Sequence, residues 1–65
     1  MKVDEVIQRV EAVRMAAGDE EGAHLREDEL WADVLVAIAN GADDAMSLAQ
    51  AALRTKAMAF QRWCA

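Results

Sequence analysis

The 65-residue sequence has no proline and no tyrosine, one cysteine, one histidine and three glycines. The single cysteine, Cys64, cannot form an internal disulfide, so a disulfide framework is excluded and a reducing intracellular setting is expected. A closed structural zinc site is built mainly from cysteine and histidine, and this chain has too few of them. We therefore expect neither a cofactor nor a bound metal.

Basic residues and long apolar runs are also scarce. Seven Lys and Arg residues stand against twelve Asp and Glu residues, which gives a net charge of -5. Binding of nucleic acid through phosphate neutralisation needs clustered basic residues, so no direct nucleic-acid binding is expected. The opening residues include acids and no uninterrupted apolar segment, which predicts neither a signal peptide nor a membrane span. The sequence favours a soluble, cytoplasmic protein.

Alanine and other good helix formers are abundant, which predicts a chain that is nearly all helix. Gly18 and Gly41 divide it into three segments, because glycine just past a helix end is a common stop. Asp19 is the expected N-cap of the second helix, and either Asp43 or Asp44 that of the third. The expected helices cover roughly residues 4–17, 19–40 and 43–63.

The connections between these helices are short, so neighbouring helices should run antiparallel. The predicted fold is all-α, a single domain over residues 1–65 that forms a small antiparallel three-helix bundle. Lys56 interrupts the apolar stripe of the third helix. Either the helix breaks near Thr55, which gives a short fourth helix, or Lys56 faces inward.

The second helix carries two polar residues, His24 and Glu27, on the same side as Leu30 and Val34. In an antiparallel pair of helices joined near Gly41, residues whose numbers add to about 83 lie at the same height. Trp31 then lies beside Ala52, and Glu27 lies beside Lys56.

This register predicts a structural ion pair between Glu27 and Lys56, near the open end of the bundle, with His24 as a buried polar residue. The alternative is a metal site formed by His24, Glu27 and Asp28, whose spacings of three and four place them on adjacent turns. A single histidine among carboxylates is more often hydrogen-bonded, so the ion pair is the preferred interpretation.

No catalytic arrangement is evident in the sequence. A general acid or base needs a nucleophile or oxyanion donors around a concave pocket, and a bundle of this size hardly encloses one. We therefore expect that the protein is not an enzyme. Acidic residues concentrate between Asp19 and Asp33, and aromatic residues concentrate at the C-terminal end.

Both features are typical of protein–protein contact surfaces, and small cores often gain stability from a partner, so a homo-oligomer is a second expectation. Imitation of nucleic acid by the acidic face is less favoured, because acids also occur in the first turn of a helix and on its solvated face. The candidate partner-binding residues are Asp28, Glu29, Trp31, Asp33, Met58, Phe60 and Trp63.

The segments "AHLREDELWADVLVAIANGA", "AALRT" and "FQRWCA" resemble small proteins of bacteriophage and prophage genomes, many from phages of actinobacteria, with no established general function. The resemblance covers residues 23–65. It rests on Ala23, His24, Glu27, Asp28, Leu30, Asp33, Val34, Leu35, Ala37, Ile38, Ala39, Gly41, Ala52, Leu53, Thr55, Phe60, Arg62 and Trp63.

This resemblance implies a phage protein that acts in the cytoplasm of a host cell. Small phage proteins often bind a host protein, so the expected function is a non-enzymatic, acidic interaction module that binds or inhibits a protein partner. The alternative is a structural, oligomeric accessory protein of a phage particle or assembly.

Overall fold

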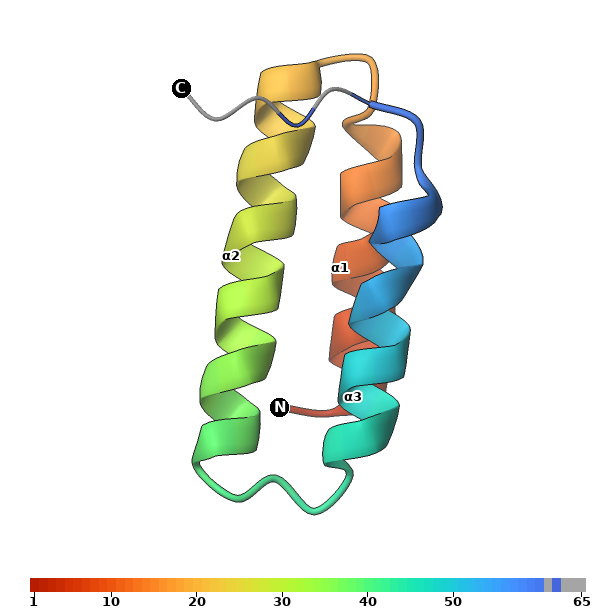
Figure 1. Cartoon of the computed structure of the whole chain (residues 1–65). Helices are drawn as coiled ribbons and strands as arrows, with labels where there is room; N and C mark the ends of the chain where they lie inside the picture. The colour runs from red at the N-terminus through yellow and green to blue at the C-terminus, as the bar shows by residue number, and fades with distance from the viewer. Residues whose placement is uncertain (61, 63–65) are drawn as a thin grey trace.

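The computed structural model describes residues 1–60 and residue 62. Its elements are α1 (Val3–Met15), α2 (Glu20–Ala39), α3 (Ala45–Ala52) and the 3-10 helix η1 (Leu53–Ala57). Figure 1 shows the three α-helices side by side, with α2 antiparallel to α1 and α3. The predicted all-α three-helix bundle with a short extra helix near Thr55 is confirmed.

The third α-helix is much shorter than the predicted span of residues 43–63. It ends at Ala52, η1 follows, and the backbone is extended at Met58, with φ -78° and ψ 136°. In a continuous α-helix the carbonyl of Ala52 would accept the backbone N–H of Lys56. Here that carbonyl accepts Trp31 Nε1 and Thr55 Oγ1, each at 3.2 Å. The break is therefore the correct alternative, and Lys56 is exposed instead of facing inward.

The helix ends follow the sequence in part. The Asp19 carboxylate caps α2 by accepting the Gly22 N–H at 3.2 Å, and Gly41 ends it with a φ of 90°. Gly18 was expected to stop α1 in the same way, but it has no positive φ; α1 ends at Met15 in a turn closed by backbone hydrogen bonds. Asp44 occupies the N-cap position of α3, yet its side chain makes no cap hydrogen bond.

The hydrophobic core lies where the three helices meet. One buried residue appears at nearly every turn, as expected for amphipathic helices packed around a single core. The main cluster consists of Val6, Val10, Leu30, Val34, Leu48, Ala51 and Ala52. A second cluster, Val13, Ala23 and Phe60, closes the end of the bundle where α1 ends and α2 begins.

The predicted register between the second and third helices is confirmed where it can be read directly. Trp31 lies beside Ala52, to whose carbonyl its indole N–H donates a hydrogen bond at 3.2 Å. Among the described residues, no helix is long and apolar enough to cross a membrane.

Candidate functional site

After η1, the described residues 58–60 and 62 form a crossing segment at the end of the bundle where α1 ends and α2 begins (Figure 1). Phe60 anchors this crossing, because its ring is only 8% exposed and packs with Val13 and Ala23. Met58 is half-buried and packs against the same cluster. The described part of this segment is therefore packed onto the helices and is not a free end.

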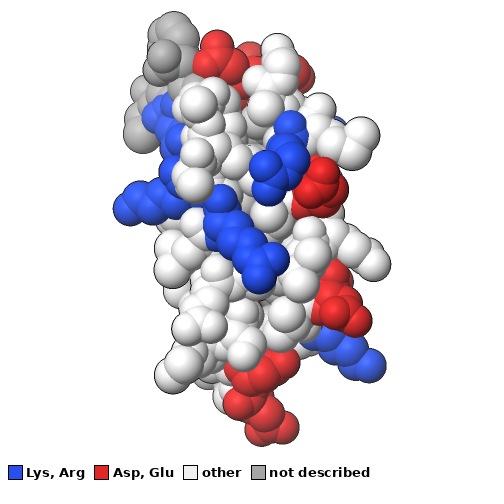
Figure 2. All heavy atoms as spheres, turned by 90° about the vertical axis from the view of Figure 1, so that its right-hand side faces the viewer, with Lys and Arg blue, Asp and Glu red and all other residues white. Residues whose placement is uncertain are grey.

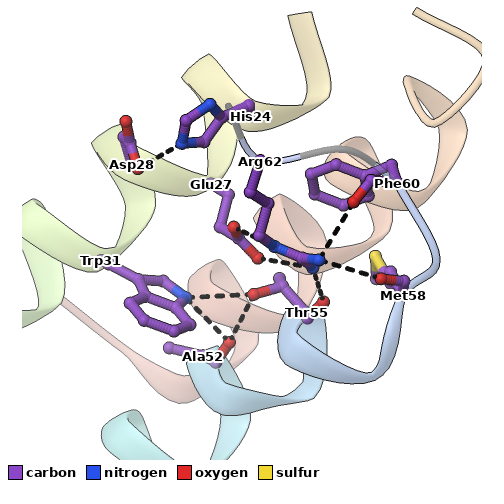
Figure 3. A network of polar contacts seen from close by, with 9 residues as sticks. All are labelled: His24, Glu27, Asp28, Trp31, Ala52, Thr55, Met58, Phe60 and Arg62. Atoms are coloured by element: carbon purple, nitrogen blue, oxygen red, sulfur yellow. Dashed lines mark hydrogen bonds and ion pairs between the residues drawn. The ribbon is translucent and has the colours of Figure 1, made fainter. Parts of the chain in front are cut away.

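Arg62 holds this segment on the bundle through hydrogen bonds to α2, to η1 and to the segment itself (Figure 3). Its Nε and Nη2 donate to the two carboxylate oxygens of Glu27, at 2.7 and 3.2 Å. Nη2 also donates to the Thr55 carbonyl at 2.7 Å, and Nη1 donates to the carbonyls of Met58 and Phe60 at 3.1 and 3.2 Å. A guanidinium has five N–H donors, and these five bonds use all of them.

The guanidinium of Arg62 also lies 4.0 Å from the centre of the Phe60 ring, which is a cation–π contact. Arg62 therefore joins α2, η1 and the crossing segment at one point. Because each of its donors is engaged, it holds the chain together and has none left for a ligand.

Glu27 lies in the core-facing stripe of α2 and is only 4% exposed. Burial by itself raises the pKa of its carboxyl. Hydrogen bonding with Arg62 and Thr55, together with the positive charges of Arg62 and His24, outweighs burial and holds this pKa below the ordinary glutamate value. The buried group is thus a carboxylate matched to one bidentate cation.

The predicted cation was wrong. Glu27 pairs with Arg62 instead of Lys56, and within residues 1–60 and 62 Lys56 forms no ion pair. The prediction that Glu27 lies level with Lys56 was correct to one residue, since Thr55 is the η1 residue that faces Glu27. The tighter turn of η1 directs Thr55 inward, and Thr55 is fully buried, whereas Lys56 points to solvent.

Thr55 and Trp31 continue the network between α2 and η1 (Figure 3). The hydroxyl of Thr55 donates to the Ala52 carbonyl and accepts the indole N–H of Trp31 at 3.1 Å. No buried side-chain polar atom of the described residues lacks a hydrogen-bond partner. This buried polar cluster is therefore fully satisfied, which is the condition under which such a cluster stabilises a unique packing.

His24 was expected to be buried, but its side chain is 22% exposed. Its Nε2 lies 3.4 Å from Oδ1 of Asp28, one turn further along α2. Figure 3 shows Glu27 turned toward Arg62 and away from this pair, so the three residues of the alternative metal site do not converge. Within residues 1–60 and 62, no group of three or more histidine, cysteine, aspartate or glutamate side chains could hold a metal ion.

The candidate partner-binding residues separate into two groups. Asp28, Glu29 and Asp33 are exposed on α2, and Asp33 also accepts Arg9 of α1 in an ion pair at 2.8 Å. The aromatic end is less available than expected, as Phe60 is buried and Trp31 and Met58 are half-buried. Trp63, the remaining candidate, lies outside the described residues.

Sequence reasoning missed Arg62, because on a continuous helix it falls on the polar side, away from the apolar stripe. One signal did point to it indirectly. A carboxylate in the core-facing stripe of α2 requires a cation, since a buried charge is tolerated only when it is paired. The sequence offers several basic residues after α3, and only the path of the chain selects among them.

Within residues 1–60 and 62, we single out two surfaces on which large apolar side chains are open to solvent. The outer stripe of α2, which we define as Leu25, Glu29, Ala32 and Val36, runs along the side of the helix opposite the core. Between α2 and α3 lies an apolar groove with a volume of ≈ 150 Å³. Its lining residues are Trp31, Val34, Leu35, Ile38, Ala49, Ala52 and Leu53.

Comparison of the chain with protein-family models, with curated proteins and with solved structures finds no match.

Proposed function

We propose that this protein is a non-enzymatic interaction module of phage type, which binds a protein of its host cell through the outer stripe of α2. The observation that carries the proposal is a second helical stripe of core-like spacing that the bundle leaves uncovered. Leu25, Glu29, Ala32 and Val36 follow at intervals of four, three and four residues, and all four are exposed.

Two apolar members of the stripe, Leu25 and Val36, are large enough to anchor a partner. Leu25 is 59% exposed and Val36 is 58% exposed, although both belong to residue types that are usually buried. Exposed apolar side chains at helical spacing, next to polar ones, are typical of a helix face that docks on another protein.

The charges around the stripe indicate the chemistry of the partner. Glu29 lies within the stripe and Asp28 lies beside it, both exposed, on a chain whose net charge is -5. A complementary surface would present apolar side chains next to Lys or Arg, because like charges across an interface cost several kcal/mol. The partner is therefore a protein with a basic, partly apolar docking surface.

The test is capture of a host protein by tagged wild-type protein and by matched variants, with identification by mass spectrometry. Asp28→Lys with Glu29→Lys should leave the helical circular dichroism nearly unchanged, since both residues are exposed. Capture should nevertheless fail. Glu5→Lys with Glu11→Lys makes the same change of charge on the exposed side of α1 and should keep the partner.

Leu25→Asp should also abolish capture, and higher salt should weaken the wild-type complex, because exposed charges are screened. Salt-insensitive capture by the variant with both α2 charges reversed would contradict the proposal, as would loss of capture with the α1 control.

The second candidate, a structural subunit of an assembly, is favoured by the groove between α2 and α3. That groove is a separate apolar surface that a monomer leaves open.

A further inference from the structure

The groove between α2 and α3 is lined by residues of α2, α3 and η1 and by none of α1, so it lies on a side of the bundle that α1 does not cover. Its lining side chains are apolar except for the indole N–H of Trp31, which is bonded to Ala52 and Thr55 inside the bundle. A surface of this kind gains free energy when another apolar surface covers it.

The leucine side chains at the rim of the groove are of a size that fits the space inside it. Leu35 of α2 and Leu53 of η1 stand at the rim and are 65% and 54% exposed, whereas the α3 side is lined by the small residues Ala49 and Ala52. A leucine from a second copy could therefore fill the space above the alanines, as a knob fills a hole between packed helices. A two-fold interface uses the same patch on both copies, so one such fit is made twice.

The exposed charges just before α3 and within η1 are opposite in sign. In a 3-10 helix residues three apart are eclipsed, so Lys56 lies directly beyond Leu53 at one end. Asp43 and Asp44 precede α3 at the other end. All three side chains are exposed, and none forms an ion pair with another described residue.

Figure 2 views the molecule from the side of α3. An acidic group lies at the bottom of the molecule and Lys and Arg side chains lie across its middle, while further acidic side chains lie at the top and along the right-hand side and one basic side chain lies at the lower right. A two-fold axis perpendicular to the helices turns one copy end for end. It therefore places Lys56 of each copy toward Asp43 and Asp44 of the other.

We propose that a second copy of this chain occupies the groove, in an antiparallel two-fold dimer. Leu35 and Leu53 of each copy fill the groove of the other, and Lys56 of each copy pairs with Asp43 and Asp44 of the other. The described chain has extents of 34 × 22 × 15 Å, so a standard interface of roughly 800 Å² per partner would cover about the whole of one broad face.

The dimer is tested by the molar mass in solution, from light scattering and sedimentation over micromolar to high micromolar concentrations. Wild-type protein should reach the mass of two chains as the concentration rises. Leu53→Asp should stay a monomer over the same range, because it places a carboxylate in an apolar contact. Leu25→Asp is the matched control; its residue is similarly exposed but belongs to the outer stripe of α2, so this variant should dimerise like wild type.

Charge reversal tests the antiparallel arrangement. Lys56→Asp alone, and Asp43→Lys with Asp44→Lys, should each weaken dimerisation about tenfold or more, since each creates like charges across the interface. A chain that carries all three substitutions should dimerise again as wild type does. Circular dichroism of each variant verifies that the helices are intact.

The proposal is overturned if wild-type protein stays monomeric throughout, even if another protein then binds the groove. It is also overturned if Leu53→Asp dimerises normally. The same holds if neither Lys56→Asp nor the variant with Asp43→Lys and Asp44→Lys weakens dimerisation, which is the result expected for a parallel pair. The outcome is independent of the proposed function, which uses the outer stripe of α2 and is tested by different variants.

Discussion

At the scale of single residues, the most unusual feature is a carboxylate in the core. Glu27 is 4% exposed in a stripe that otherwise consists of Ala23, Leu30 and Val34. Such a group is stable only if its charge is matched and its lone pairs are hydrogen-bonded. Arg62 meets both conditions through two parallel hydrogen bonds, the geometry in which a guanidinium fits a carboxylate best.

Arg62→Ala should therefore destabilise the protein by about 3 kcal/mol, the lower end of the cost of leaving one member of a buried ion pair unmatched. Arg54→Ala removes an exposed arginine of η1 and should change stability by no more than about 0.5 kcal/mol. Urea unfolding followed by circular dichroism measures both.

The variant Glu27→Leu with Arg62→Ala should lose less stability than Arg62→Ala alone, because it leaves no unpaired charge in the core. Equal effects of Arg62→Ala and Arg54→Ala would show that the bidentate pair does not contribute to stability.

The same pair makes stability depend on pH. The pKa of Glu27 is lower in the folded protein than in the unfolded chain, so the unfolded chain takes up the proton first as the pH falls. The contribution of Glu27 is therefore complete above the ordinary glutamate pKa of about 4.3 and is lost below it. Glu27→Gln should reduce the loss of unfolding free energy between neutral and acidic pH.

In the Arg62→Ala variant, the contribution of Glu27 to stability should change with pH in the opposite direction. Without its cation, burial raises the pKa of Glu27, so the protonated form is favoured in the folded state and stability decreases as the pH rises. Urea unfolding at a series of pH values distinguishes these slopes. An unchanged pH dependence in both variants would contradict the assignment.

At the scale of elements, local sequence decides where α2 begins and ends, whereas tertiary contacts decide where α3 ends. Asp19 and Gly41 bound α2 with a side-chain cap and a left-handed residue. No comparable signal follows Ala52, whose carbonyl is taken by Trp31 and Thr55. The extended segment that begins at Met58 can reach the end of the bundle only because the helix stops there.

Gly41→Ala should destabilise the protein by about 1–2 kcal/mol, because its φ of 90° is costly for a residue with a side chain. Gly18→Ala provides the matched control. Neither glycine has an atom within 4 Å of an added methyl group, but Gly18 has no positive φ. Its substitution should be neutral or stabilise by about 0.4–1 kcal/mol, through the unfolded chain. Thermal melts would disprove this account if the two variants melted alike.

At the scale of the whole molecule, the fold depends on few core residues. A chain below about 70–80 residues rarely derives more than about 3–5 kcal/mol of net stability from one core. The centre of this core is formed by Val6, Leu30 and Leu48, all fully buried, one on each helix. Other large apolar residues, among them Leu35 and Leu53, remain exposed.

Leu48→Ala should cost about 2–5 kcal/mol, which is enough to unfold much of the protein at room temperature. Leu53→Ala changes the same residue type five positions later, where the side chain is 54% exposed, and should cost no more than about 0.5 kcal/mol in the monomer. Urea unfolding at a concentration where the protein is monomeric checks both. A large loss at Leu53 would mean that it contributes to the core and is not available to a second copy.

The sequence by itself determined the three helices, their antiparallel order and the register that brings Trp31 to Ala52. These features follow from periodicity, caps and short connections, which are local. It also identified Glu27 as a core-facing charge in need of a cation. Among the candidate partner-binding residues that the structure describes, only the acids of α2 are fully exposed, because exposure there follows from helical periodicity alone.

Only the tertiary structure decided which cation meets Glu27 and which apolar residues stay exposed. Arg62 lies 35 residues from Glu27, and the contact exists because Trp31 and Thr55 end the third helix early. Once the helix ends, the chain can cross the bundle, bury Phe60 and bring the guanidinium to the carboxylate. No local pattern encodes this path, since it is selected by the match of a buried charge and its hydrogen bonds across three elements.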